Sequence, residues 1–256
     1  RKAMKTEKMI EFFKLTLKYL DHSIDRNKRE DGLYHAYNLI SFNDNQISIR
    51  YLYEMLEGQV AVLSSGYLCA EDSLEVLNAL KASSLFRADQ YSYILYPNRQ
   101  LQLFINKNTI PRKSIDSIEL LQQLLKDGQT SIIKPDIMGN LHFNSRFRNA
   151  GHLKEALEEL SVSEYKSLVA HDREAVLKLY ESVFDHQSFT GRSGTFYGYE
   201  GLGSIYWHMV SKLLLATQEC FFRGLRNNAN EITLGQLKEH YYEIKAGIGL
   251  YKNPEI

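Results

Sequence analysis

The chain has 256 residues, of which 44% are hydrophobic and 24% are charged, as in an ordinary globular protein. Lysine plus arginine and aspartate plus glutamate each number 31, so the formal net charge is zero. This balance provides no positive field for nucleic acid or an anionic membrane surface, and we expect neither as a partner. No apolar run approaches the roughly 20 residues that a membrane span requires. We therefore expect a soluble cytoplasmic or periplasmic protein.

The cysteines and the two ends of the sequence give further expectations. Cys69 and Cys220 match no metal-binding or redox spacing and lie in apolar helical surroundings, so we expect two buried free thiols. The sequence begins with Arg1, without a signal peptide, and stops after YKNPEI. Both ends are typical of cuts, which predicts a fragment of a longer polypeptide. We expect residues 1–256 to form a single α-helical domain.

In the first third of the chain, apolar residues recur mainly at helical spacing. Residues 6–25 are predicted to form an amphipathic helix with one buried stripe, which consists of Ile10, Phe13, Leu17, Leu20 and Ile24. A turn at Asp31-Gly32 precedes DGLYHAYNLI. Helices are then predicted over 46–64 and 70–82, and together they form an antiparallel hairpin.

The middle of the chain is less regular. A short strand or an extended segment is predicted before Pro97. We expect a short helix capped by Ser114 and ending near Lys126. Gly139-Asn140 with flanking apolar residues predicts a small β-hairpin.

The last hundred residues are predicted to be almost entirely helical. The expected helices span 150–160, 163–185, 200–224 and 234–246, and the third is apolar around most of its circumference, as an inner helix is. The segment 185–222 combines glycines, aromatic rings and charged side chains more densely than any other. The fold class is therefore all-α, with helices paired as hairpins and small extended insertions. The sequence contains no repeat at a fixed period, so a solenoid is not predicted.

Three segments resemble the six-hairpin glycosidase group, whose catalytic domains are (α/α) toroids. They are DGLYHAYNLI at 31–40, the helix pair containing YLYEMLEGQVAVLSSGYL, and SGTFYGYEGLGSIYWHM at 193–209. The chain looks most like the cellobiose-phosphorylase type or a bacterial relative of that group. The resemblance implies a full or partial toroid that hydrolyses or phosphorolyses a glycosidic bond of an oligosaccharide.

Glycosidic cleavage needs two carboxylates across a cleft, or one carboxylic acid together with phosphate. Glu200 is the first candidate, because tyrosines precede it and an apolar helix is predicted to follow. A glutamate at a helix N-terminus is also favoured by the helix dipole alone, which would lower its pKa. Asp31 is the second candidate, although Asp-Gly is also a common turn dipeptide.

The remaining candidates would bind substrate. They are Arg192, Tyr197, Tyr199, Trp207, His208, His35 and Asn38. Arg192 lies in a glycine-rich segment suited to phosphate, which is the one co-substrate we expect; no cofactor and no metal are predicted. Trp207 either stacks on a sugar ring or packs in the core. The alternative function is a non-catalytic helical binding or assembly domain, and the expected partners are an oligosaccharide and the remainder of a longer chain.

Overall fold

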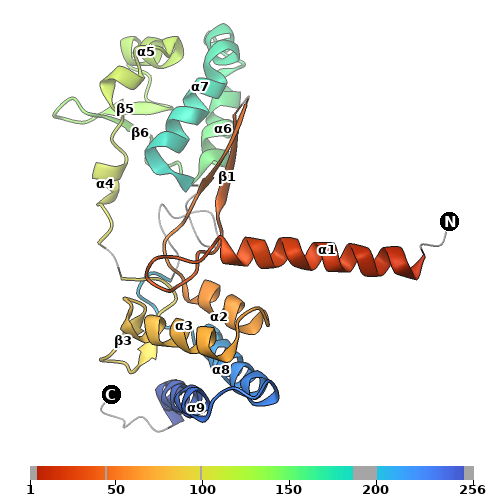
Figure 1. Cartoon of the computed structure of the whole chain (residues 1–256). Helices are drawn as coiled ribbons and strands as arrows, with labels where there is room; N and C mark the ends of the chain where they lie inside the picture. Colours follow the sequence, from red (N-terminus) through yellow and green to blue (C-terminus); the bar gives the residue numbers. More distant parts are fainter. Residues whose placement is uncertain (1–4, 44, 99, 187–200, 251–256) are drawn as a thin grey trace. The chain divides into compact units, whose positions relative to one another are not determined.

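The structure is a computed structural model that describes residues 5–43, 45–98, 100–186 and 201–250 (Figure 1). The chain divides into two compact units: Arg1–Arg99 with Gly201–Ile256, and Gln100–Glu200. Helices predominate among the described residues, beside three separate two-stranded antiparallel sheets. The mostly helical fold class with small extended insertions is confirmed, whereas the toroid stays a prediction.

Four packed helices form the body of unit 1. They are α2 (Leu56–Ser64), α3 (Ala70–Ala82), α8 (Trp207–Arg226) and α9 (Glu231–Lys245) (Figure 1). The most extensive contacts join α8 to α9 and to α2, and α8 also contacts α3. The close approach depends on Gly224, because a β-carbon there would lie 3.0 Å from the Cβ of Ala70. The prediction of an inner helix that is buried around most of its circumference is wrong, because only one face of α8 packs in unit 1, whereas Leu215, Phe222 and Leu225 are 53%, 46% and 52% exposed.

A buried glutamine fastens the loop after Asp31 to α2. The backbone N–H of Tyr34 donates to Oε1 of Gln59 at 2.9 Å, and Nε2 of Gln59 donates back to the carbonyl of Tyr34 at 2.9 Å. A third bond runs from Nε2 to the carbonyl of Met55 at 3.0 Å. Gln59 is completely buried, so its amide satisfies backbone groups that water cannot reach.

Unit 1 also contains six elements outside this four-helix body. They are α1 (Thr6–Asp25), β1 (Leu39–Asn43), β2 (Gln46–Arg50), β3 (Phe86–Arg87), β4 (Ser92–Tyr93) and the final π-helical turn η3 (Ala246–Leu250). The strands pair in sequence as two hairpins, with Ile40 opposite Ile49 and Phe86 opposite Tyr93. The extended segment predicted before Pro97 is thus confirmed.

Three predictions about residues 6–82 are wrong. The helix at 6–25 exists, but none of its residues is buried. The helix predicted from residue 46 begins only at Leu56, because Ile47 and Ile49 alternate with polar residues and form β2 instead. Cys69 is exposed at the N-cap of α3, where its sulfur accepts a hydrogen bond from the backbone of Asp72; only Cys220 is a buried thiol.

The helix predicted from residue 200 also begins later, at Trp207. Gly201 and Gly203 have φ angles of 77° and 68°, in the left-handed region that a right-handed helix cannot contain. Between them, Leu202 pairs with Tyr96 in a parallel bridge, and the N–H of Leu95 donates to the carbonyl of Ser204 at 3.0 Å. Contacts with a distant segment therefore hold these residues extended.

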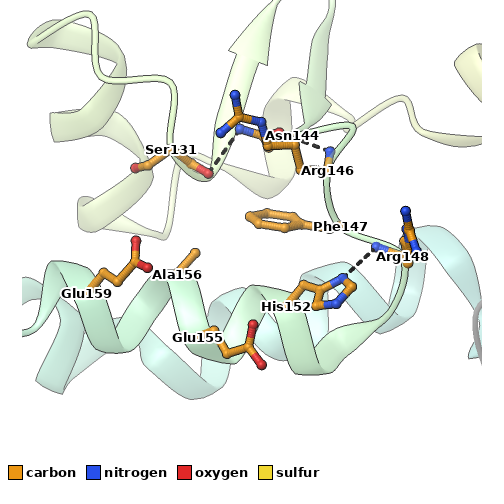
Figure 2. A pocket seen from close by; sticks show the side chains of 9 residues that line it. All are labelled: Ser131, Asn144, Arg146, Phe147, Arg148, His152, Glu155, Ala156 and Glu159. Atoms are coloured by element: carbon orange, nitrogen blue, oxygen red, sulfur yellow. Dashed lines mark hydrogen bonds between the residues drawn. The ribbon is translucent and has the colours of Figure 1, made fainter.

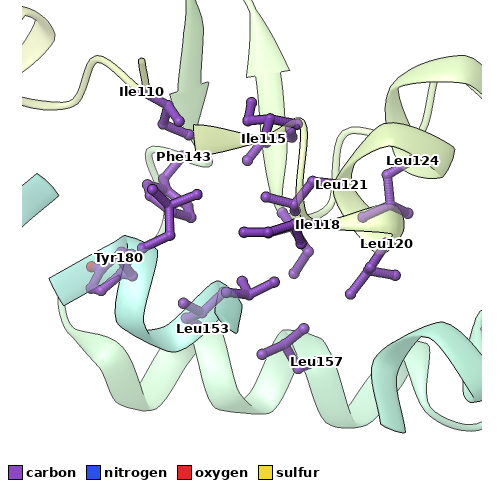
Figure 3. Close-up of a cluster of buried hydrophobic side chains, with 14 of the residues drawn as sticks. Ile110, Ile115, Ile118, Leu120, Leu121, Leu124, Phe143, Leu153, Leu157 and Tyr180 are labelled. Atoms are coloured by element: carbon purple, nitrogen blue, oxygen red, sulfur yellow. The ribbon is translucent and has the colours of Figure 1, made fainter. Parts of the chain in front are cut away.

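Unit 2 packs helices against one small hairpin. Its elements are α4 (Phe104–Lys107), the 3₁₀ turn η1 (Arg112–Ser114), α5 (Glu119–Lys126), β5 (Ile133–Pro135), β6 (Leu141–Phe143), α6 (Ala150–Leu160) and α7 (Lys166–Phe184). Leucines of α5 and α6 meet aromatic rings of β6 and α7 in one buried cluster, part of which Figure 3 shows. The predicted hairpin at Gly139-Asn140 and the helices in 150–160 and 163–185 are confirmed.

Buried polar side chains complete this unit. Asn108 holds β6 in place, because its Nδ2 donates to the carbonyl of Phe143 at 2.8 Å and its Oδ1 accepts from the N–H of Phe143 at 2.9 Å.

The predicted helix start at Ser114 is wrong, since α5 begins at Glu119. No described helix of either unit has the length and apolarity to cross a membrane.

Candidate functional site

Unit 2 contains an open pocket of about 490 Å³ on the surface of α6 (Figure 2). Two segments supply most of its walls: the loop that follows β6 and the first two turns of α6. The lining residues are Ser131, Asn144, Arg146, Phe147, Arg148, His152, Glu155, Ala156 and Glu159. Because both segments belong to unit 2, the pocket is complete within that unit.

The helical repeat explains the α6 wall. His152, Glu155 and Glu159 follow one another at spacings of three and four residues, which brings them onto one face of the helix. Figure 2 shows the ring of Phe147 between this wall and the loop. Phe147 is itself buried, and its ring lies edge-on to that of Tyr180, with the centroids 6.4 Å apart. An aromatic side chain fixed by the core thus lies at the base of a polar pocket.

Hydrogen bonds hold the loop wall in one conformation. The N–H of Arg146 donates to Oδ1 of Asn144 at 3.0 Å, and Nδ2 of Asn144 donates to the carbonyl of Thr130 at 3.0 Å. The N–H of Arg148 donates to Nδ1 of His152 at 3.2 Å (Figure 2). This bond requires Nδ1 to be an acceptor, so the neutral imidazole has its proton on Nε2.

The charges of the pocket balance. Arg146 and Arg148 are exposed on the loop, and Glu155 and Glu159 are exposed on the helix. Within the described residues these four side chains form no ion pair with one another or with other groups. The hydroxyl oxygen of Ser131 is buried and has no hydrogen-bond partner in the described part of the chain. The pocket therefore offers unused donors and acceptors without a net charge.

Asp31, one predicted catalytic residue, lies in unit 1 and is bound to a neighbouring guanidinium. Nε and Nη2 of Arg29 donate to its carboxylate at 3.0 and 2.7 Å, and the N–H of Leu33 donates at 3.1 Å. The hydrogen bond from Arg29 is the main reason that the pKa of Asp31 lies below its usual range. Asp31 is consequently an ionised carboxylate at neutral pH, which suits a base and not a proton donor.

His35 and Asn38 lie in the same loop. The imidazole of His35 stacks on Tyr51 with the ring centroids 4.2 Å apart, and burial together with the charge of Arg29 lowers its pKa. Nδ2 of Asn38 donates to Oδ1 of Asn27 at 2.6 Å. The structure thus brings Asp31, His35 and Asn38 into one hydrogen-bonded loop of unit 1.

Trp207 and His208 form the first turn of α8. Trp207 is 44% exposed, so its ring is only partly packed. His208 is exposed and its ring lies 5.8 Å from that of Tyr206. The other predicted site residues, Arg192, Tyr197, Tyr199 and Glu200, lie outside the described residues, so their roles stay predictions.

One comparison bears on unit 2. Residues 101–187 match the family described as GH149 phosphorylase insertion domain 2. The match covers roughly a third of the chain and nearly coincides with unit 2. Unit 2 is therefore similar to an insertion domain of a carbohydrate phosphorylase. A comparison with curated proteins gave no significant match.

The sequence did not predict the pocket of unit 2. Its loop residues lie in the segment NSRFR, which the sequence indicates only as a non-helical connection. The available signal was weak: two arginines flank a phenylalanine, and two glutamates follow with helical spacing. Only the packing of this loop against α6 brings these side chains around one cavity.

Proposed function

We propose that this chain is part of a carbohydrate-active enzyme that cleaves a glycosidic bond of an oligosaccharide, with inorganic phosphate as co-substrate. The observation that carries the proposal is the match of residues 101–187 to a phosphorylase insertion domain. In phosphorolysis, a phosphate oxygen attacks the anomeric carbon, the glycosidic C–O bond breaks, and the departing sugar takes up a proton. The products are a sugar phosphate and a shortened oligosaccharide.

Within this function, unit 2 binds the oligosaccharide and does not cleave it. A cleavage site places its carboxyl groups on opposite sides of the bond and keeps the acid in a desolvated environment. Glu155 and Glu159 instead lie on the same helix and are exposed to water. Their position suits hydrogen bonding to hydroxyl groups.

The chemistry of the pocket favours a neutral sugar. Arg146 and Arg148 donate hydrogen bonds, Glu155 and Glu159 accept them, and the pocket has no net formal charge to attract an ion. A sugar hydroxyl both donates and accepts, so one molecule can use both walls. Phe147 adds an aromatic side chain at the base of the pocket, against which the C–H groups of a sugar ring can pack.

Catalysis is assigned to Glu200 as the acid, with Asp31 as the second carboxylate. The ionised state of Asp31 supports a role that needs negative charge, because Arg29 stabilises the carboxylate. Arg192 is assigned to phosphate, and Tyr197, Tyr199, Trp207 and His208 to the sugar. His35 and Asn38, in the same loop as Asp31, are also assigned to substrate binding.

The second candidate function is a non-catalytic binding or assembly domain. The exposed carboxylates of the pocket favour binding without chemistry, and α1, none of whose residues is buried, favours assembly. An insertion domain also need not be catalytic itself. In this case the chain would act through the remainder of a longer polypeptide.

Two measurements on the full-length polypeptide separate these functions. Incubation with oligosaccharides and orthophosphate should yield a sugar phosphate; failure to form either this product or a hydrolysed sugar would favour the non-catalytic alternative.

Calorimetry should show oligosaccharide binding that weakens roughly tenfold or more in Arg146→Ala and Glu155→Gln, because each removes hydrogen bonds to the ligand. Lys154→Ala and Glu174→Gln are matched controls on exposed residues outside the lining. Equal affinity in all four variants would contradict the assignment of the pocket.

A further inference from the structure

The N-terminal helix α1 exposes an apolar stripe along most of its length, up to the partly buried Ile24. No residue of Thr6–Asp25 is buried. Ile10, Phe13, Leu17 and Leu20 are 48%, 60%, 58% and 55% exposed, and Ile24 continues the stripe. Most of the stability of a helix in a protein comes from packing of its apolar face, so a stripe of this kind is normally covered by a partner.

The spacing of the stripe identifies the kind of partner. The intervals from Ile10 to Ile24 are three, four, three and four residues, which is the heptad seam of a coiled coil. In this repeat, Ile10, Leu17 and Ile24 occupy the a positions, and Phe13 and Leu20 occupy the d positions. Such a seam fits another helix with the same repeat, and α1 of a second copy has one.

We propose that α1 pairs with α1 of a second copy of this chain, in antiparallel orientation about a two-fold axis. Leu17 then packs against Leu20 of the second copy, and Phe13 packs against Ile24 of the second copy. The two-fold axis repeats each contact, so four residues provide four layers of the seam. Phe12, Leu15 and Tyr19 lie outside this seam.

The charges beside the seam select the orientation and the register. Lys14 and Asp21 both occupy e positions, seven residues apart. In the proposed register, Lys14 lies beside Asp21 of the second copy, and the symmetry axis generates this attractive pair twice. A shift by one heptad would instead place Lys14 beside Lys14 of the second copy, and Glu7 beside its Asp21. That register is disfavoured by like charges.

The residues at the g positions, on the other flank of the seam, favour the antiparallel pair over a parallel one. In parallel coiled coils the e residues of one helix face the g residues of the other. The g positions of α1 are Met9, Thr16 and Ser23, which are uncharged, and the two hydroxyls donate to the backbone carbonyls of Phe12 and Tyr19 at 2.9 and 2.7 Å. Lys14 and Asp21 form no ion pair within the described part of the chain and remain available to the second copy.

A charge-exchange experiment tests the pairing. Sedimentation equilibrium of the 256-residue chain should give a monomer–dimer equilibrium, and Lys14→Glu and Asp21→Lys should each raise the dissociation constant at least tenfold. An equimolar mixture of these two variants should form a heterodimer, because each mixed contact again joins opposite charges. Lys18→Glu, on the polar side of α1, should leave the dissociation constant unchanged.

Other outcomes would overturn the proposal. A chain that remains monomeric at all concentrations would exclude a self-complementary α1. A dimer that persists in Leu17→Glu would use another surface, provided that circular dichroism shows an unchanged helix content. Failure of the two charge variants to combine would exclude the antiparallel register.

Discussion

The carboxylate of Asp172 in α7 accepts a hydrogen bond from the backbone N–H of Leu120 at 2.7 Å, and this contact fixes the start of α5. The helix has no side-chain cap at its own N-cap residue, Ile118. Asp172 is 2% exposed, so the bond is shielded from water. An acidic residue from another helix therefore supplies the acceptor that usually comes from a neighbouring serine or aspartate.

Replacing Asp172 with alanine should destabilise unit 2 by about 3 kcal/mol, because the N–H of Leu120 would remain buried without an acceptor. Asp172→Asn should cost less, since its amide oxygen can still accept. Urea denaturation followed by circular dichroism measures both losses. Glu174→Ala is the control, because this residue is exposed on the same helix. An equal loss in the control would contradict the capping role.

Gln59 should be equally sensitive to substitution. Gln59→Leu removes the acceptor and donors that bind the backbone of Tyr34 and Met55, and the expected loss is about 3 kcal/mol of unfolding free energy. Gln59→Glu should lose at least as much, because a carboxylate would face two carbonyl oxygens. Gln218→Leu on the exposed side of α8 controls for the change of residue type. Thermal and urea unfolding of unit 1 measure the difference.

Local signals in the sequence predicted several elements correctly. The leucines of 70–82 repeat at helical spacing, and α3 spans Ala70–Ala82. Gly139-Asn140 marks the turn between β5 and β6, and Gly139 has a positive φ of 81°. In each case the deciding information lies within about a dozen residues.

The errors came from information outside the local sequence. Ile49 fits both a helical repeat and an alternating strand, and its pairing with Ile40 decides for the strand. The start of α8 depends on the pairing of Leu202 with Tyr96, which are more than a hundred positions apart. The pocket is a similar case, because no local pattern indicates that Arg146 and Glu155 line one cavity.

The stability of unit 1 should fall in mild acid because of His240. This residue is buried, and Nε2 lies 2.8 Å from Oδ1 of Asn78. Burial lowers its pKa below the ordinary value of 6.5, and the ammonium of Lys81 lowers it further against the opposing charge of Glu243. The unfolded chain therefore binds more protons below pH 6.5, so stability is complete above that pH and decreases as the pH falls.

Unfolding free energies measured between pH 5 and pH 8 test this expectation (a range around the ordinary histidine pKa of about 6.5). In His240→Gln the acid-side decrease should be smaller, because glutamine does not titrate but can still donate to Asn78. His22→Gln, at an exposed histidine of the same unit, provides the control for the change of residue type. An unaltered profile in His240→Gln would assign the decrease to other groups.

The catalytic proposal depends most directly on Glu200. Glu200→Gln keeps the size of the side chain but cannot donate a proton, so cleavage of oligosaccharides by the full-length polypeptide should fall by about 10²–10⁴-fold while the fold is retained. Asp31→Asn should also reduce cleavage, because it replaces the charge that Arg29 stabilises, but it should in addition disturb the loop that contains His35. Product formation and circular dichroism, measured on both variants, separate these effects. Unchanged cleavage in Glu200→Gln would exclude this residue as the acid, and the proton would then have to come from another group.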